Sequence, residues 1–271
     1  MRQTGREGTI IASTNNDSSL LRVTNVSVRF GGITALDGVS FDIERGQIAG
    51  LIGPNGAGKT TLFNCLSRLY HLHAGDIWFE GRSLTDQPRH RIAALGIGRT
   101  FQNIALFGTM TVRQNILLGG HSGARSGFLC NALRLPLVRR EEHVLAQRAE
   151  SLLDFLDLRA IAEMRVMDLP FGLQKRVELA RALAGEPKLL LLDEPAGGLN
   201  HEEVGALVRL LRDIRERLQL TILLVEHHMN LVMNVSDKVV ALNCGRKIAD
   251  GTPEEVRRNP DLIRAYLGTE I

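Results

Sequence analysis

The sequence contains few cysteines and no long apolar run. Cys65, Cys130 and Cys244 are far apart and odd in number, so they do not suggest a disulfide framework. No apolar stretch approaches the roughly 20 residues that a membrane-spanning helix needs. The opening segment, MRQTGREGTIIASTNNDSS, also lacks the apolar centre of a secretory signal. These absences favour reduced thiols in a cytosolic protein, which would act at a membrane only through a partner.

An excess of one charge is missing too. The 33 Lys and Arg residues nearly balance the 30 Asp and Glu residues, which leaves a net charge of +3. That charge is too small to indicate a nucleic-acid partner, although it is compatible with docking near an anionic membrane surface. Hydrophobic residues make up 44% of the 271-residue chain, enough for a sizeable core. Residues 1–19 are rich in Thr, Asn, Ser and Gly, so we expect a disordered leader there and a folded domain over residues 20–271.

Strand and helix patterns alternate along most of the chain. Residues 23–30 and 38–43 alternate apolar and polar side chains, as half-buried strands do. Residues 46–53 and 188–193 are nearly continuous apolar runs, which is typical of strands buried on both faces. Helical patterns follow the buried strands, so the sequence predicts an α/β core. Residues at about 84–185 are mostly helical in pattern and indicate an inserted α-helical subdomain.

The segment GPNGAGKT matches the phosphate-loop pattern of a glycine, four residues, and then Gly-Lys-Ser/Thr. It follows a predicted buried strand and opens a predicted helix, so a chance Gly-rich turn is a poor alternative. Its glycines allow backbone N–H groups to turn toward phosphate oxygens. Lys59 would neutralise the β and γ phosphates of ATP, and the Thr60 hydroxyl would bind Mg²⁺. The residues expected to contact the nucleotide are Gly53, Pro54, Asn55, Gly56, Ala57, Gly58, Lys59, Thr60 and Thr61.

Two acidic residues follow the leucine-rich strand KLLLLD. Asp193 and Glu194 would lie at its carboxyl end, where open α/β sheets bind their ligands. Asp193 would hold Mg²⁺, and Glu194 would deprotonate the attacking water. A solvated strand end is the alternative, but the phosphate loop requires an acidic partner of this kind.

Residues 21–270 resemble the ATP-binding subunit of an ABC transporter. Beyond the two motifs above, Phe30 matches the aromatic residue that stacks on adenine, and Gln102 matches the glutamine that links the nucleotide to the helical subdomain and the membrane partner. His227 matches the histidine that contacts the γ-phosphate. The resemblance implies a P-loop NTPase fold with an antiparallel β subdomain, and an ATPase that uses ATP and Mg²⁺. It assigns catalysis to Lys59, Glu194 and His227, and Mg²⁺ to Thr60, Gln102 and Asp193.

Members of this family pair head to tail, so that each ATP lies between one chain's phosphate loop and the other chain's signature motif, Leu-Ser-Gly-Gly-Gln. The aligned residues here are Leu169, Pro170, Phe171, Gly172 and Leu173, followed by Gln174. The serine is missing, and a bulky Phe171 replaces one glycine. Gly172, Gln174 and the helix dipole remain to contact a nucleotide. This degenerate signature favours pairing with a second, different ATP-binding subunit.

The segment AGGLN stands where the family usually has an aspartate in the loop that crosses the dimer. Asn200 could serve that crossing loop, or it could cap the following helix together with Glu203. Asn is among the best helix caps, so we favour the cap as its main role.

The signature segment, the excursion at 120–140 and the terminal segment DGTPEEVRRNPDLIRAYLG together resemble the branched-chain amino-acid importers. That resemblance implies two unlike ATP-binding subunits, two transmembrane permease subunits and, indirectly, a periplasmic solute-binding protein. The protein would sit peripherally on the cytoplasmic face of the inner membrane. The alternatives are an ABC ATPase for urea or amide import, or for lipid export, and a soluble ABC protein. The missing signature serine counts against the export systems, and a single phosphate loop without heptads counts against the soluble class.

Overall fold

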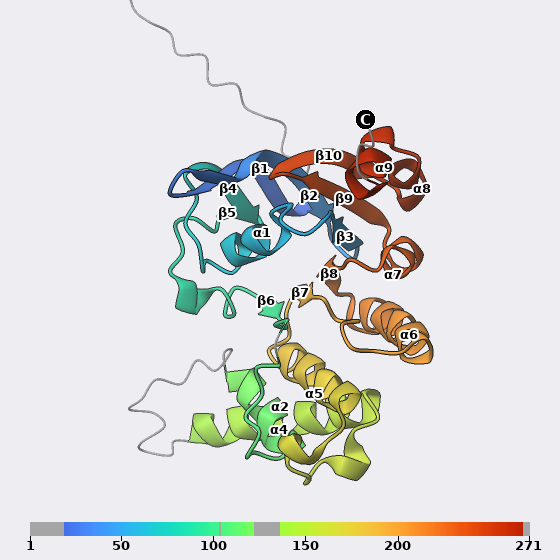
Figure 1. Ribbon diagram of the computed structural model, residues 1–271. Coiled ribbons are helices and arrows are strands. Elements are labelled where there is room, and N and C mark those ends of the chain that lie inside the picture. Colours follow the sequence, from blue (N-terminus) through green and yellow to red (C-terminus); the bar gives the residue numbers. More distant parts are fainter. Residues whose placement is uncertain (1–18, 103, 122–135, 268–271) are drawn as a thin grey trace, which may run out of the picture.

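The computed structural model describes residues 19–102, 104–121 and 136–267 (Figure 1). The expected leader therefore lies outside the described residues, except for Ser19, the first residue of β1. Most of the excursion at 120–140 lies outside them as well. No helix in the described part of the chain is both long enough and apolar enough to span a bilayer.

The larger sheet has six strands in the order β10-β9-β3-β8-β7-β6. Neighbouring strands from β9 to β6 pair in parallel, and β10 pairs antiparallel to β9. Every residue of β3, β7 and β8 is buried, as the apolar runs predict for β3 and β7. The strands are β3 (Ile48–Ile52), β6 (Ile97–Arg99), β7 (Leu189–Asp193), β8 (Thr221–Val225), β9 (Lys238–Asn243) and β10 (Arg246–Gly251).

A second sheet of four antiparallel strands, in the order β2-β1-β4-β5, lies beside the first (Figure 1). Its strands are β1 (Ser19–Phe30), β2 (Ile33–Glu44), β4 (Ala74–Phe79) and β5 (Arg82–Ser83). Helix α1 (Lys59–Leu66) packs between the two sheets, and the side chains of Leu62, Phe63 and Leu66 are fully buried. This packing fixes the start of α1, and with it the phosphate loop, against both sheets.

The other helices contribute side chains to the hydrophobic cluster on the opposite face of the six-stranded sheet. Along β7, Leu189 and Leu191 face the α1 side, whereas Leu190 and Leu192 face the cluster that includes the remaining helices. These helices are α2 (Val112–Gly120), α4 (Pro136–Phe155), α5 (Phe171–Leu183), α6 (His201–Leu218), α7 (Met229–Val235), α8 (Pro253–Arg257) and α9 (Pro260–Leu267).

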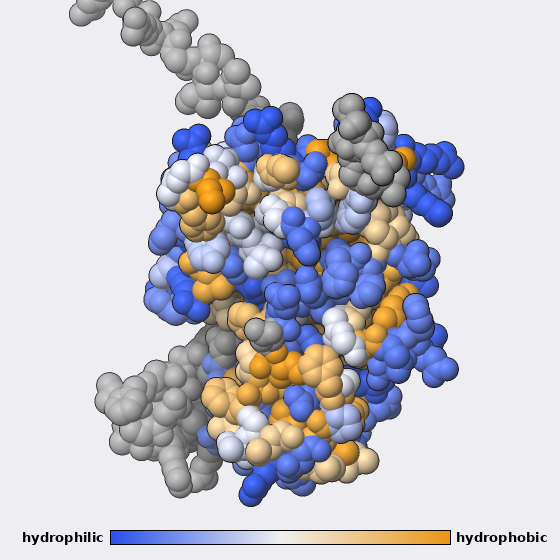
Figure 2. Space-filling view, viewed as in Figure 1, coloured by the Kyte–Doolittle hydropathy of each residue, from blue (hydrophilic) through white to orange (hydrophobic). Residues whose placement is uncertain are grey.

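Helices α2, α4 and α5 form a separate body below the sheets, which we call the helical body (Figure 1). It lies within the range 84–185 predicted for an inserted helical subdomain. That range also holds β6, a short strand that the sequence did not predict and that joins the six-stranded sheet. Figure 2 shows hydrophobic side chains gathered on the front of the helical body. Its exposed apolar residues include Phe107, Met164, Met167 and Phe171.

Asn200 caps α6, as its position in the sequence predicts. Its side chain accepts hydrogen bonds from the backbone N–H groups of Glu202 and Glu203, both at 3.0 Å. In return, the Glu203 carboxylate accepts from the N–H of Asn200 at 2.8 Å. This reciprocal box stabilises the first turn of the longest helix that follows β7.

Candidate active site

The phosphate loop occupies the turn between β3 and α1, and close packing requires glycine at two of its positions. A Cβ atom on Gly53 would lie 2.2 Å from the carbonyl oxygen of Leu242, and one on Gly58 would lie 2.7 Å from that of Ala35. Gly58 is also the N-cap residue of α1, with φ of 101°, and no side chain caps this helix. The N–H groups of the first turn of α1 are therefore free of any side-chain cap and open toward the loop, which suits them to bind phosphate oxygens.

The side chain of Lys59 lies inside this loop. Only 7% of the residue is exposed, and its Nζ donates to the carbonyl oxygens of Gly53 at 2.6 Å and Pro54 at 3.0 Å. Burial lowers the pKa of the Lys59 ammonium group, while the charges of Glu194 and Asp193 act to raise it. The loop thus holds a partly desolvated cation at its centre, where an anion would be strongly attracted.

Asp193 and Glu194 stand at the carboxyl end of β7, as predicted. Asp193 is 3% exposed, and its Oδ2 lies 3.0 Å from Nη2 of Arg99. Burial raises the pKa of the Asp193 carboxyl group, and the Arg99 charge opposes that rise. Glu194 is more open and has φ of 48°, in the left-handed region that non-glycine residues rarely adopt. Backbone outliers of this kind concentrate at functional sites.

Three of the predicted site residues converge at this point. Gln102 donates from Nε2 to Oε2 of Glu194 at 3.1 Å, and Nδ1 of His227 lies 3.9 Å from Oε1 of Glu194. They come from the loops that follow β6, β7 and β8, three neighbouring parallel strands. The carboxyl ends of these strands meet at one edge of the sheet, which explains how Gln102 and Glu194, 92 positions apart, become neighbours.

Glu226 holds the end of β8 in place. It is fully buried, and its carboxylate accepts from the N–H of Ala196 at 2.7 Å and from that of His227 at 3.2 Å. The carboxylate therefore joins the loop after β7 to the loop that carries His227.

Arg99 is a site residue that the sequence did not predict. Besides Asp193, it binds Asn64 Oδ1 at 3.0 Å and Ser67 Oγ at 2.8 Å through Nη1, and its guanidinium lies 5.1 Å from the centre of the Phe101 ring. One cation thus connects β6, β7 and the end of α1. The sequence offered one signal for Arg99, a charged residue inside the apolar stretch GIGRTF. We did not interpret that stretch as a strand leading to the site, because it lies in a segment with a helical pattern.

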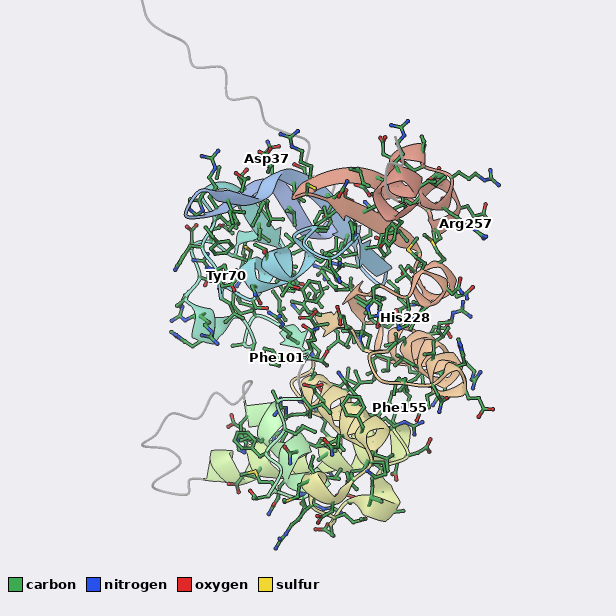
Figure 3. All side chains as sticks on the ribbon, in the orientation of Figure 1. Asp37, Tyr70, Phe101, Phe155, His228 and Arg257 are labelled. Carbon is green, nitrogen blue, oxygen red and sulfur yellow. The ribbon has the colours of Figure 1, made fainter. Side chains whose placement is uncertain are left out.

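Phe30 is 46% exposed at the end of β1. Its ring packs edge-on against that of Tyr70, with the ring centres 5.1 Å apart. Tyr70, labelled in Figure 3, follows α1 and was not predicted as part of the site. Phe30 therefore leaves nearly half of its surface exposed while an aromatic neighbour holds its ring.

The signature segment lies at the start of α5, in the helical body. Nε2 of Gln174 donates to the carbonyl oxygen of Leu169 at 2.8 Å, so this side chain folds back on its own segment. The ring of Phe171 packs closely on Gly198, in the loop before α6. A Cβ atom added to Gly198 would lie only 2.9 Å from the ring. Within the described ranges, no hydrogen bond links Gly172 or Gln174 to the phosphate loop of the same chain.

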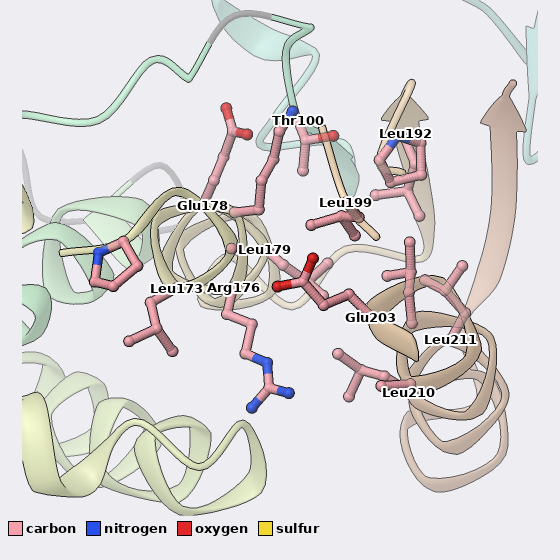
Figure 4. Close-up of a pocket in the computed structure, with 16 residues that line it drawn as sticks. Thr100, Leu173, Arg176, Glu178, Leu179, Leu192, Leu199, Glu203, Leu210 and Leu211 are labelled. Atoms are coloured by element: carbon pink, nitrogen blue, oxygen red, sulfur yellow. The ribbon is translucent and has the colours of Figure 1, made fainter. Parts of the chain in front are cut away.

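A cavity of about 270 Å³ separates α5 from α6 near this segment (Figure 4). Its wall is mostly apolar, with the Glu203 carboxylate and the Arg176 side chain at its edge. Apart from this cavity, buried side chains of α5 such as Val177 and Leu183 join the same hydrophobic cluster as Leu192 of β7.

One face of α5 holds that loop. Lys175, Glu178 and Arg181 recur every three residues, and we call them the α5 polar stripe. The Glu178 carboxylate accepts from the N–H groups of Phe101 and Ala105, both at 3.3 Å. Arg181 donates to the carbonyl oxygen of Ala105 at 2.6 Å, and Lys175 to that of Gln102 at 3.3 Å. Lys175, in the first turn of the signature helix, thus contacts the Gln102 loop of its own chain.

Replacing Glu178 by alanine should lower the rate of ATP hydrolysis about tenfold, because two N–H groups of the Gln102 loop lose their acceptor and the loop loosens. Glu178 is 1% exposed, and its carboxyl pKa is raised by burial. The matched variant, Glu178→Gln, retains an acceptor oxygen and should lose less activity. Steady-state ATPase assays on both variants, with thermal unfolding to verify folding, make the comparison. Equal ATPase activities in the two variants would contradict the role of Glu178 as the hydrogen-bond acceptor for this loop.

Comparisons with known proteins agree with this arrangement. The family model described as ABC transporter matches residues 36–197, and one described as branched-chain amino acid ATP-binding cassette transporter matches residues 246–271. BraF of Pseudomonas aeruginosa, a high-affinity branched-chain amino acid transport ATP-binding protein, is 43% identical over 249 residues, which span 92% of this chain and 98% of BraF. LivG of Escherichia coli strain K12, described in the same words, is 42% identical with the same coverage.

The fold matches solved structures as well. A crystal structure of the ADP conformation of an ATP-binding cassette of an ABC transporter is similar with a TM-score of 0.80 and 30% identity, over 93% of this chain and 99% of that one. A nucleotide-free cassette gives the same TM-score at 29% identity, over 93% of this chain and 100% of that one. The predicted fold is confirmed, and the chain belongs to the ATP-binding ATPase subunits of ABC transporters, in the family of BraF and LivG.

Proposed function

We propose that this protein hydrolyses ATP to drive an ABC importer for branched-chain amino acids. The relatives named above support the substrate class, since their names describe high-affinity transport of these amino acids. The observation that carries the ATPase assignment is the convergence of Gln102, Glu194 and His227 beside the phosphate loop. Residues 20–271 would form the ATP-binding domain, with the helical subdomain at about 84–185.

The phosphate loop would bind the phosphates of ATP. Its backbone N–H groups and the buried Lys59 ammonium supply the positive field, and Lys59 already faces the loop centre. On the base side, the exposed ring of Phe30 would stack on adenine, with the Tyr70 ring packed edge-on beside it.

The residues near the phosphate loop also fit Mg²⁺. The Thr60 hydroxyl, the Gln102 amide oxygen and the Asp193 carboxylate are hard oxygen donors of the kind that Mg²⁺ prefers. The structure is compatible with this set, because the amide nitrogen of Gln102 binds Glu194 and so leaves the amide oxygen for another partner. Bound there, Mg²⁺ would neutralise charge on the phosphates. Arg99 would hold the Asp193 carboxylate in place from its other side.

Glu194 would act as the general base. Its carboxylate takes a proton from water, the water oxygen bonds to the γ-phosphorus, and the bond from that phosphorus to the β–γ bridging oxygen breaks to release ADP. Gln102 and His227, both near the Glu194 carboxylate, would orient the water and the γ-phosphate respectively.

The signature segment at the start of α5 would contact the ATP that a neighbouring chain holds in its phosphate loop. Gly172 and Gln174 make no hydrogen bond to their own phosphate loop within the described residues, which supports a role toward a nucleotide held by another subunit. Because Pro170 and Phe171 depart from the signature pattern, we infer a different ATP-binding partner. Two transmembrane permeases would complete the importer at the cytoplasmic face of the inner membrane, with a periplasmic solute-binding protein as an indirect partner. The exposed apolar residues of the helical body support such docking.

A pull-down of the tagged protein from detergent-solubilised native membranes tests this assembly. We expect to recover two polytopic membrane proteins and a second, different ATP-binding chain, identified by mass spectrometry. An untagged strain provides the control for nonspecific recovery. Recovery of the protein alone, or with ribosomes or DNA, would contradict the importer.

A further inference from the structure

The phosphate loop is bonded to the C-terminal helix. The N–H of Gly53, the first glycine of the loop, donates to the hydroxyl oxygen of Tyr266 at 2.9 Å. Tyr266 stands in the last turn of α9, 213 residues further along the chain. Figure 1 shows α9 beside β10, at the same end of the molecule as β9 and β3.

Gly53 needs an acceptor from outside the sheet. Its neighbour Ile52 is the last residue of β3, and the pairing of β3 with β9 ends there. The next N–H is buried and has no strand to bind, and a buried N–H without a partner is costly. The hydroxyl of Tyr266 supplies that partner at the point where the sheet ends.

The same glycine also holds the catalytic lysine. While its N–H is bound to Tyr266, its carbonyl oxygen accepts from Nζ of Lys59 at 2.6 Å. Gly53 has φ of 148°, and glycine rotates freely about its backbone bonds unless something outside it fixes them. The bond from Tyr266 fixes the peptide on one side of Gly53, and the bond from Lys59 holds the carbonyl on the other side, so the two bonds together restrict this glycine.

Helix α9 is anchored through Leu262 and the residue before the helix, Asn259, while Tyr266 itself is 37% exposed. Leu262 is 3% exposed in the same cluster as Val256 of α8. Asn259 accepts from the N–H groups of Asp261 at 2.8 Å and Leu262 at 3.3 Å, and donates to the carbonyl oxygen of Ile248 in β10 at 3.4 Å. The C-terminal segment thus reaches Gly53 from a packed support.

A second bond ties the other end of the loop to the same region. The N–H of Gly245, in the turn between β9 and β10, donates to the carbonyl oxygen of Ala57 at 3.0 Å. Residues from β9 to α9 therefore hold the loop at both ends.

We propose that Tyr266 is a positioning residue for the nucleotide site, acting through Gly53 to hold the phosphate loop in the shape that binds phosphate. The inference rests on the proposed function, because it assumes that this loop binds ATP. Its effect would reach the nucleotide through the loop backbone and Lys59.

The test is Tyr266→Phe, which removes one oxygen and keeps the ring. The dissociation constants for ADP and ATP with Mg²⁺, measured by calorimetry on the full chain, should rise about two- to tenfold, the range of one net hydrogen bond. The KM for ATP should rise similarly while kcat changes less, because Glu194 and Gln102 are untouched. Exchange of the Gly53 amide hydrogen should become faster. The control is Arg264→Ala, on the same helix, whose side chain is 69% exposed and which should leave all these values unchanged.

Wild-type affinities in Tyr266→Phe would overturn the proposal, and so would a lower melting temperature with unchanged nucleotide affinity. Either result would leave Tyr266 as a packing residue only. If the unmodified chain bound neither ADP nor ATP, the proposed function itself would fail, and the two failures are therefore distinguishable.

Discussion

Replacing Glu194 by glutamine should slow ATP hydrolysis at least about 100-fold while ATP still binds. Glutamine has nearly the same size and can still hydrogen bond to Gln102, which lies 3.1 Å away. It cannot accept the proton of the attacking water at neutral pH. The phosphate loop and Lys59 are unchanged, so the dissociation constant for ATP should stay close to that of the unmodified protein.

Steady-state ATPase assays and ATP-binding calorimetry on the same preparation make this measurement. The matched control is Glu216→Gln, which removes one carboxylate charge at a position 66% exposed on α6. The control should retain full activity. Near-normal turnover in Glu194→Gln would refute Glu194 as the base, even if the protein proved to be an ATPase.

Replacing Lys59 by methionine should weaken nucleotide binding, whereas Glu194→Gln should slow hydrolysis and leave binding unchanged. We expect the dissociation constants for ADP and ATP to rise about 10- to 150-fold, since hydrogen bonds to charged groups contribute roughly 1.5–3 kcal/mol. Methionine keeps most of the length of this 93%-buried side chain but removes the ammonium group that binds Gly53 and Pro54. Hydrolysis should then fall because the nucleotide does not bind at ordinary concentrations.

The Lys59→Met variant should remain folded. Burial lowers the pKa of the lysine, which means that the folded protein bears a cost for keeping this charge out of water. Removing the charge should leave the melting temperature of the nucleotide-free protein unchanged or higher, and should abolish the stabilisation that ADP gives the unmodified protein. An unaltered affinity for ADP would show that the loop binds without its lysine and would contradict the assignment.

The parts of the site that could be predicted are the ones encoded locally. The phosphate loop lies within nine consecutive residues, and the strands before it and before Asp193 are apolar runs that only a buried strand explains. Asn200 was recognisable as a cap because its partner Glu203 is three residues away. In each case the sequence neighbours supply the physical reason.

The parts that were missed depend on contacts between distant residues. Arg99 meets Asp193 across 94 positions, and Tyr266 meets Gly53 across 213. No local pattern marks Tyr266, because a tyrosine near a helix end is usually a surface group, and the single local signal for Arg99 is its charge within the apolar stretch GIGRTF. Strand β6 was missed because three residues are too few for a periodic pattern. The helix predicted to open at the phosphate loop ends as α1 at Leu66, and Arg68 shortly after it adopts φ of 56°, outside the right-handed helical region.

A ribosome releases β3 long before the strands that flank it in the finished sheet. Strand β3 lies between β8 and β9, and β8 begins only about 170 residues later in the chain. At about 5–20 residues per second, the phosphate loop emerges roughly 10–30 seconds before those neighbours exist. Pairings of such long separation also form slowly, because the intervening chain must first be closed into a loop. The phosphate loop therefore cannot take up its final place in the sheet until β8 and β9 have been synthesised.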